Sequence, residues 1–465
     1  MSNLKPIYKL ILCCACVTSL LSCSKFLEEK SNTALLIPNS LKDLQALLDN
    51  NTTLNTSVGP GLVELITDDY FVNEAAYNNL SEFERQNYIW DGNPEYLLPQ
   101  VMEEWKNPYL TIFYGNMVLE RLLKIEEKGN PNYDYIKGSA LFFRAYTYFQ
   151  MAQVYCSDYR IRDENHNNSS FGLPLRLNTD FEEKSKRSTL NETYFQILKD
   201  LEEASNLLPE SVSSVTRPSK SAAFAMLARV YLSMERYDDA LSAANRALEK
   251  NNFLLDYKDL DKNSSTPFEA MNKETIFFAY STSLNVLDPS TVNVDSILYR
   301  SYSNDDLRKY LFFNKKDDGE YDFKGNYAGY YNSSFFNGLA VDELYLIKSE
   351  CLARNNKILE SKKTLESLLN KRYASQYTFP ENILSKDEVL RYVLQERRKQ
   401  LLFRGVRWSD LRRLNKDKRF QKVLIRKVKT EGQAKVYTLP IDDLRFTLLL
   451  PQDVIRITGI EQNPR

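Results

Sequence analysis

Aromatic and polar side chains gather in two segments of the chain that could recognise a ligand. One segment ends at Trp90, and the other is 321–338, in which tyrosines lie among glycines and asparagines. Aromatic faces stack on the C–H faces of sugars, while amides and carboxylates bind hydroxyl groups. A loop of Gly, Asn and Tyr also suits an adaptable recognition surface. The candidate ligand-binding residues are therefore Trp90, Tyr70, Tyr77, Tyr327, Tyr330 and Tyr331, and packing beneath the surface is the alternative for both segments.

The charged pairs and runs are weaker candidates for chemistry. Asp342 and Glu343 are adjacent, and neighbours on a helix diverge by about 100°, so they cannot flank one bond as a two-carboxylate hydrolase requires. We expect them at a solvated helix start. Asp68-Asp69 could hold a calcium ion, but a solvated turn is the expectation. The basic run 397–413 could meet an anionic substrate, although ion pairing across helices is favoured.

The composition narrows the function classes further. The 465 residues include 61 Lys+Arg and 62 Asp+Glu, and this balance disfavours nucleic acid as a partner. The single histidine, His166, excludes a multi-histidine metal site. Glycine is scarce, and we find no phosphate-binding or nucleophile motif. We therefore predict a protein that is not an enzyme and that has no cofactor and no metal.

Helices must position these segments. Residues 222–249 show the small-residue spacing of a tetratricopeptide (TPR) repeat at Ala228, Ala240 and Ala247, with Tyr231 filling the groove beside them. A weaker copy at 345–368 keeps the spacing through Ser349, Ser361 and Leu368, with Leu352 at the tyrosine position. Further helices are predicted at 105–125, 133–155, 189–208 and 386–414. Strand signals are few, at 274–280, 434–440 and 446–450.

The first residues predict a targeting signal rather than a structural element. Two lysines precede about a dozen apolar residues, which are too few to span a bilayer, and the segment ends in Leu20-Leu21-Ser22-Cys23. This sequence resembles a bacterial lipobox. We expect residues 1–22 to be a lipoprotein signal peptide and Cys23 to be the lipidated residue, so that the lipid alone attaches the protein to the membrane. Cys156 and Cys351 are expected to be buried free thiols.

Seven short blocks, in order along the chain, resemble the SusD/RagB family of nutrient-binding outer-membrane lipoproteins. They are Cys23 with Phe26-Leu27-Glu28; Trp105-x3-Tyr109-x2-Ile112-x3-Asn116; Arg144-Ala145-Tyr146-x-Tyr148 with Gly172-Leu173-Pro174-Leu175; Arg187-Ser188-Thr189 through Leu208-Pro209; the repeat at 222–249; Glu396-Arg397-Arg398 through Arg407-Trp408-x-Asp410-Leu411-x-Arg413; and Pro451 with Gln462-Asn463-Pro464. Three features depart from the pattern: Cys156 stands where the family has Gly, Gln400 and Arg404 replace glutamates, and the final Gly-Tyr is absent.

The resemblance implies a mainly α fold, a right-handed TPR-like α-superhelix with irregular loops and few short strands, and one domain over 23–465. It places Trp105 and Trp408 in the core. It implies a surface-exposed, lipid-anchored protein of the cell outer membrane that captures glycan oligomers and acts as the lid of a SusC-like TonB-dependent transporter. A peptide-binding, RagB-like version of this role stays open. A structural TPR lipoprotein in outer-membrane assembly and a surface hydrolase are further alternatives.

Overall fold

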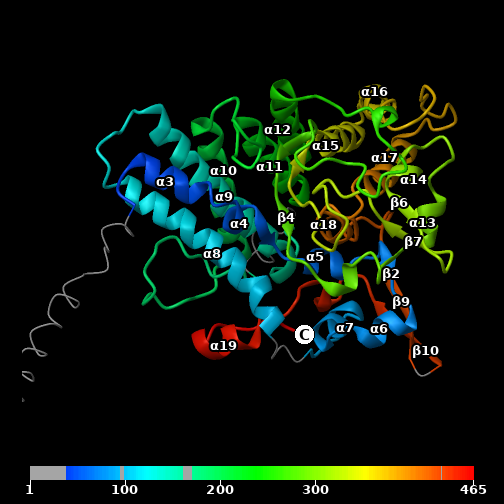
Figure 1. Cartoon of the computed structure of the whole chain (residues 1–465), viewed down its shortest axis with the longest axis horizontal. Helices are drawn as coiled ribbons and strands as arrows, with labels where there is room; N and C mark the ends of the chain where they lie inside the picture. Colours follow the sequence, from blue (N-terminus) through cyan, green and yellow to red (C-terminus); the bar gives the residue numbers. More distant parts are fainter. Residues whose placement is uncertain (1–37, 95–98, 161–169, 431) are drawn as a thin grey trace, which may run out of the picture.

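The computed structural model describes residues 38–94, 99–160, 170–430 and 432–465. The fold is mainly helical with few short strands, as predicted. Helices α8–α12 and α15–α16 form the stack at the left and top of Figure 1, while short helices and strands fill the lower right. The predicted signal peptide and Cys23 lie outside the described residues, as does His166.

The helices and strands have the following bounds. The helices are α3 (Leu41–Leu48), α4 (Asn51–Leu54), α5 (Leu62–Leu65), α6 (Glu74–Asn79), α7 (Glu82–Tyr88), α8 (Pro99–Leu122), α9 (Pro131–Tyr155), α10 (Leu190–Leu207), α11 (Lys220–Ser233), α12 (Tyr237–Lys250), α13 (Ser296–Arg300), α14 (Arg308–Leu311), α15 (Val341–Arg354), α16 (Ile358–Leu369), α17 (Lys386–Gln400), α18 (Arg407–Leu414) and α19 (Gln452–Thr458). The strands are β1 (Thr56–Gly59), β2 (Tyr70–Phe71), β3 (Thr275–Phe277), β4 (Tyr280–Ser281), β5 (Asn293–Val294), β6 (Phe313–Lys315), β7 (Tyr321–Phe323), β8 (Leu339–Ala340), β9 (Leu424–Thr430) and β10 (Gln433–Leu439).

The stack is built from helices that each pack on the next. Helices α8 to α12 follow one another in this way, α15 then packs on α12, and α16 and α17 pack on α15. Sequence periodicity located these helices well, and the capping box predicted at the start of α10 forms between Thr189 and Glu192. The predicted long helix at 386–414 is two helices, α17 and α18.

The two repeat copies share the same turn. In the pair α11–α12, Glu235 has φ = 61°, and in the pair α15–α16 the equivalent Asn356 has φ = 60°. The backbone N–H of Arg236 donates to the Tyr231 carbonyl at 2.9 Å, and that of Lys357 donates to the Leu352 carbonyl at 2.8 Å. The turn therefore confirms the predicted correspondence between residues 231 and 352.

Small residues mark both helix crossings. Ala228 and Ala240 are buried in the first copy, as predicted. In the second copy two serines replace the alanines, and each hydroxyl donates to the carbonyl of the other, with Ser349 Oγ at 3.0 Å and Ser361 Oγ at 2.8 Å. A buried hydroxyl is costly unless it is hydrogen-bonded, so this exchange lets serine occupy the alanine position.

The strands form two-stranded pairs among the described residues, and the longest is the antiparallel hairpin β9–β10. The predictions at 274–280 and 434–440 coincide with β3, β4 and β10. The prediction at 446–450 is wrong. This segment pairs with no strand, and the Leu448 N–H instead donates to the Val154 carbonyl of α9 at 2.9 Å, so its apolar residues cover a helix.

Three of the four carboxylates in the two acidic pairs are buried, contrary to expectation, and the fourth, on Asp68, is half-buried. Asp342 and Glu343 begin α15 inside the protein, where Arg404 contacts Asp342 at 3.2 Å and Arg229 contacts Glu343 at 2.6 Å. Burial opposes ionisation of Asp342, yet the charges of Arg404 and Arg372 hold its pKa below the ordinary value. A helix start is solvated only where no other element covers it.

The pair Asp68-Asp69 also faces arginines rather than solvent. Arg407 Nε lies 2.7 Å from Asp68, and Arg398 Nε lies 2.8 Å from Asp69, whose exposed fraction is 1%. The described residues contain no cluster of three or more His, Cys, Asp or Glu side chains arranged for a metal ion. The interpretation of the basic run 397–413 as ion pairing across helices is confirmed.

The remaining core predictions are also confirmed. Cys156 and Cys351 are buried free thiols, and burial raises the pKa of Cys156 to about 12. Trp105 and Trp408 are buried. No helix in the described part of the chain is both long and apolar enough to cross a membrane.

Candidate functional site

The first aromatic segment lies in the interior. Tyr70, Tyr77 and Trp90 have exposed fractions of 4%, 7% and 2%. The Trp90 indole N–H donates to the Ile66 carbonyl at 2.9 Å, and the Tyr70 hydroxyl donates to the Leu65 carbonyl at 2.7 Å. These rings offer no face to a ligand, so their prediction as a ligand platform is corrected to a packing role.

A buried arginine explains why these aromatic residues fold inward. Arg426 on β9 lies over the rings of Tyr88 and Trp90, with its guanidinium carbon 3.7 Å and 4.8 Å from their centroids. Its N–H groups donate to the carbonyls of Tyr88, Leu65 and Thr67. Aromatic faces and carbonyl oxygens together stabilise a cation that has left water.

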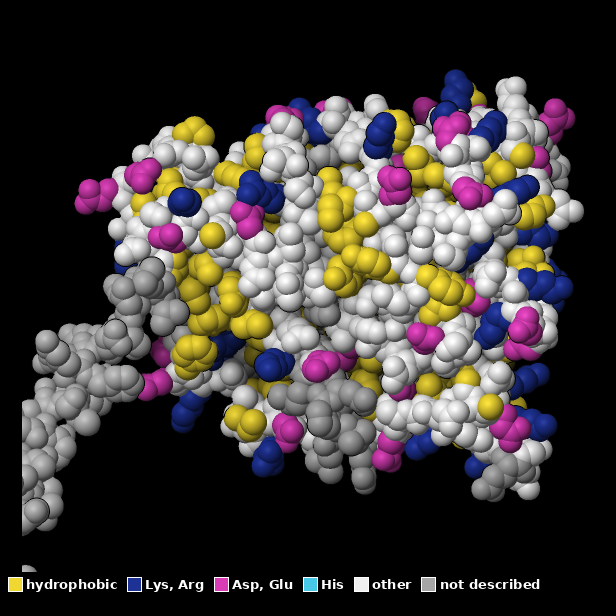
Figure 2. Space-filling model, in the orientation of Figure 1, with side chains coloured by type: hydrophobic (Ala, Val, Ile, Leu, Met, Phe, Trp, Pro, Cys, Tyr) yellow, Lys and Arg dark blue, Asp and Glu magenta, His cyan; other side chains and the backbone are white. Residues whose placement is uncertain are grey.

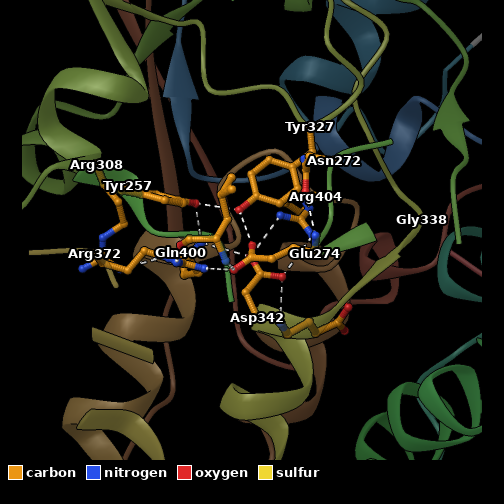
Figure 3. Close-up of polar contacts among 12 residues, drawn as sticks. Tyr257, Asn272, Glu274, Arg308, Tyr327, Gly338, Asp342, Arg372, Gln400 and Arg404 are labelled. Atoms are coloured by element: carbon orange, nitrogen blue, oxygen red, sulfur yellow. Dashed lines mark hydrogen bonds and ion pairs between the residues drawn. The ribbon is translucent and has the colours of Figure 1, made fainter. Parts of the chain in front are cut away.

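The second aromatic segment divides between interior and surface. Tyr327 is fully buried, so its prediction as a ligand contact is also corrected to a structural role. Its hydroxyl donates to Glu274 Oε2 at 2.7 Å and lies 2.6 Å from the Tyr257 hydroxyl (Figure 3). Arg372 Nη2 contacts the same Glu274 at 2.6 Å. Burial raises the pKa of the Glu274 carboxyl, and Arg372 opposes this rise.

Gln400 and Arg404, the two residues that replace the family's glutamates, take part in this buried network. Gln400 Nε2 donates to the Tyr257 hydroxyl and to Asp342 Oδ2, both at 3.0 Å. The Arg404 guanidinium contacts Asp342 and lies 4.2 Å from the Tyr327 ring centroid (Figure 3). Thus α17 and the turn after it are tied to the segment that carries the candidate tyrosines, and the replacements are part of local packing.

A single asparagine side chain cross-links the loop that follows Tyr327. Asn326 Nδ2 donates to the Tyr330 and Ser334 carbonyls at 3.1 Å and 2.9 Å, and Asn326 Oδ1 accepts from the Ala328 and Phe336 N–H groups. Gly329 has φ = 77° and lies against the Ala270 backbone, where a Cβ would come within 2.6 Å of a nitrogen. The loop is therefore fixed before any ligand arrives.

Tyr330 and Tyr331 project from this fixed loop, with exposed fractions of 48% and 38%. Apolar side chains reach the surface in patches between the helical stack and the loops around α13 and α14 (Figure 2). Tyr331 forms one wall of a cleft of about 590 Å³, whose other lining residues are Asp288, Pro289, Ser290, Asn314, Lys315, Lys316, Asp317, Asp318 and Asp322. We call it the Tyr331 cleft.

The polar wall of the Tyr331 cleft is a hairpin of β6 and β7. Asp322 is buried there, and its Oδ2 accepts from Asn314 Nδ2 at 3.4 Å, while Oδ1 has no donor among the described residues. Burial raises the pKa of Asp322, and burial together with this carboxyl raises the pKa of Tyr331 to about 12. An aromatic face beside an amide and carboxylates can bind a polyhydroxyl ligand.

Sequence reasoning missed the hairpin residues of this cleft. Segment 313–323 reads Phe-Asn-Lys-Lys-Asp-Asp-Gly-Glu-Tyr-Asp-Phe, which is two short strand patterns around an Asp-Asp-Gly turn. Such a turn between apolar runs is a recognised hairpin signal. It would have placed Asn314 and Asp322 opposite each other, as the register shows.

Two other clefts are less suited to a ligand. One of about 660 Å³ near the end of α18 is lined by cations such as Lys416 and Arg419, which form ion pairs with neighbouring carboxylates. The other, of about 610 Å³, lies between α8, α19 and residues 174–185, and the rings of Phe113 and Phe181 contact each other within it at a centroid distance of 5.0 Å. Among the described residues, neither of these two clefts places an exposed aromatic ring beside a buried carboxylate.

Comparison with known proteins agrees with this architecture. Residues 25–232 match a family described as starch-binding and associating with the outer membrane, and residues 308–446 match the SusD family. A SusD-like protein of Formosa agariphila is 24% identical, over 76% of this chain and 79% of its own.

Solved structures of the same fold cover most of the chain. A SusD superfamily protein from Bacteroides thetaiotaomicron superposes with a TM-score of 0.68 at 18% identity, covering 92% of this chain and 100% of that one. A laminarin-binding SusD-like protein superposes with a TM-score of 0.66 at 17% identity, covering 90% and 97%. The family matches to residues 25–232 and 308–446 agree with the fold, and the chain belongs to the SusD/RagB family of non-enzymatic binding proteins.

Proposed function

We propose that this protein is a cell-surface glycan-binding lipoprotein that captures sugar oligomers at the Tyr331 cleft. The observation that carries the proposal is the half-exposed Tyr331 ring, which stands on a fixed loop beside Asn314 and Asp322. A preorganised aromatic platform pays less ordering entropy on binding than a mobile loop does. The family description as starch-binding and the laminarin-binding relative support a glycan ligand.

The rest of the proposed role concerns attachment and partners. Residues 23–465 act as one unit that is attached to the outer membrane through lipid on Cys23, and the unit closes as a lid over a SusC-like TonB-dependent transporter. The family's description as associating with the outer membrane supports this location. Replacing Cys23 with alanine is expected to release the protein from the membrane fraction, and a variant that stays bound would overturn the anchoring claim.

The binding claim is tested on the full-length protein in detergent, with arrays of oligosaccharides and of peptides. We expect binding to one glycan class and loss of at least about tenfold in affinity for Tyr331→Ala. Tyr310→Ala removes a tyrosine of similar exposure outside the cleft and serves as the control. Binding to peptides alone would favour the RagB-like alternative, and glycan binding that survives Tyr331→Ala would move the site elsewhere.

A further inference from the structure

The charges of the Tyr331 cleft are unequal. Four carboxylates line it, from Asp288, Asp317, Asp318 and Asp322, against the two ammonium groups of Lys315 and Lys316. At physiological salt, charges interact over about 8 Å, so a ligand inside the cleft meets all of them. Electrostatic complementarity then excludes partners of the same sign.

One of the two ammonium groups of the cleft is already hydrogen-bonded within the protein. Lys316 Nζ donates to Asn293 Oδ1 at 2.8 Å and to the carbonyls of Ser290 and Val292, each at 3.3 Å. These contacts fix its ammonium group against the segment that precedes α13. An anionic group on a ligand would have to displace them, which leaves Lys315 as the remaining cation of the cleft wall.

The buried carboxylate has the opposite requirement. Asp322 is 3% exposed, and its Oδ1 accepts no hydrogen bond from any described residue. The Oδ1 atom has no surface of its own in the cleft, but the Asp322 carboxyl interacts with the Tyr331 hydroxyl, so its charge stands at the cleft wall. A sugar hydroxyl or an ammonium group brings a donor, whereas a carboxylate or sulfate brings only further acceptors beside an existing negative charge.

From these contacts we infer that the Tyr331 cleft selects ligands by charge. It takes uncharged oligosaccharides, binds those that carry an ammonium group more tightly, and rejects those that carry carboxylate or sulfate groups. This inference rests on the proposed glycan-binding function and names the class of glycan that the same site accepts. It follows from the excess of carboxylates, the engaged Lys316 and the position of the Asp322 carboxyl beside the Tyr331 hydroxyl.

The test uses the full-length protein and an array of oligosaccharides of matched length in three classes: neutral, ammonium-bearing, and carboxylate- or sulfate-bearing. Wild type is expected to bind the neutral and ammonium classes, with at least tenfold weaker binding of the anionic class. The variant Asp317→Asn/Asp318→Asn keeps the exposed turn, because Asn retains the acceptor that caps the Glu320 N–H. It should reduce the discrimination between neutral and anionic glycans at least threefold.

A matched control removes two charges elsewhere. Glu360→Gln/Glu381→Gln changes two exposed residues that do not line the cleft, and it should leave the discrimination unchanged. If wild type binds anionic glycans as well as neutral ones and Tyr331→Ala abolishes both, the charge inference fails while the proposed function stands. If no class binds, or binding ignores Tyr331→Ala, the proposed function fails and takes this inference with it.

Discussion

The two aromatic segments of this protein have similar compositions and different fates. In the segment that ends at Trp90, every candidate ring is buried, and the rings of Tyr70 and Trp90 lie against Arg426. In segment 321–338, Tyr327 is buried beside Glu274, whereas Tyr330 and Tyr331 reach the surface four residues or fewer away. The exposed rings are thus those on the loop that Asn326 holds, whereas the rings that pack on Arg426 or hydrogen-bond to Glu274 are buried.

The difference lies in how each buried charge is satisfied. Arg426 contacts the rings of the first segment and donates to the carbonyls of Tyr88, Leu65 and Thr67. The first segment therefore folds around this cation. Glu274 is instead satisfied by Arg372, by the Leu255 backbone N–H and by one tyrosine hydroxyl, so a single ring is enough. The other candidate tyrosines of the second segment, Tyr330 and Tyr331, therefore remain at the surface.

Removing the buried cation should have the largest effect on this comparison. We expect Arg426→Met to lower the free energy of unfolding by about 3–5 kcal/mol, because three buried carbonyls lose a charged donor and the rings lose a cation. Lys427→Met, on the exposed face of the same strand, is the control and should change stability by less than about 0.5 kcal/mol. Chemical denaturation measures both. A cost below about 1 kcal/mol for Arg426→Met would mean that the rings hold the segment inside without the cation.

The pH dependence of stability separates the two regions in a second way. Burial raises the pKa of Glu64, beside the first segment, to about 8, against the Gly405 N–H that it accepts. The folded protein holds this proton up to about pH 8, while the unfolded chain releases it near its ordinary value of 4.5. The contribution of Glu64 to stability is therefore full below pH 4.5 and is lost as the pH rises to 8.

Glu64→Gln removes this loss. Relative to wild type, the variant should gain unfolding free energy as the pH rises from about 4.5 to 8, by a few kcal/mol in total, at up to about 1.4 kcal/mol per pH unit. Denaturation curves across this pH range, with Glu381→Gln as the exposed control, measure the difference. A difference between Glu64→Gln and wild type that does not change with pH would show that Glu64 is already ionised in the folded protein.

Ligand affinity should change only in the second region. Tyr331→Ala is expected to weaken glycan binding about tenfold, equivalent to about 1.4 kcal/mol, because a stacking face is lost, while stability changes by less than about 1 kcal/mol. Tyr331→Phe keeps the ring and should retain most of the affinity. Titration calorimetry on the folded proteins makes the comparison. Equal losses for Ala and Phe would assign the contact to the hydroxyl rather than to the ring.

Sequence patterns predicted the helical stack because its determinants are local. The apolar period, the capping box at Thr189 and the small residues at the helix crossings all act within a few turns of the chain. The two aromatic segments depend on partners that lie far away in sequence. Arg426 is 336 residues beyond Trp90, and it occupies an inward position of β9, a strand that the sequence analysis did not predict.

The acidic pairs were misjudged for the same reason. Judged from the residues beside them in the sequence, Asp69 and Asp342 look solvated. Their charges can be buried because Arg398 and Arg404, from the region of α17, form ion pairs with them. The basic run 397–413 was interpreted correctly as ion pairing. The sequence alone, however, does not identify the distant carboxylates that pair with these cations. The two halves of one network, carboxylates and cations, were therefore assigned to two different environments, and only the assignment of the cations was correct.

The smallest expected effect tests whether Trp90 belongs wholly to the interior. Trp90→Phe should cost about 1–2 kcal/mol of unfolding free energy, because the hydrogen bond to the Ile66 carbonyl and part of the ring are lost. Trp408→Phe is a matched control, since the Trp408 indole N–H has no hydrogen-bond partner among the described residues and the change isolates the effect of ring size. Glycan affinity should stay within twofold of wild type for both variants. Weakening by tenfold in Trp90→Phe alone, with stability preserved, would require the first segment to open when ligand binds, and the contrast between a buried and a displayed aromatic cluster would then describe only the unliganded protein.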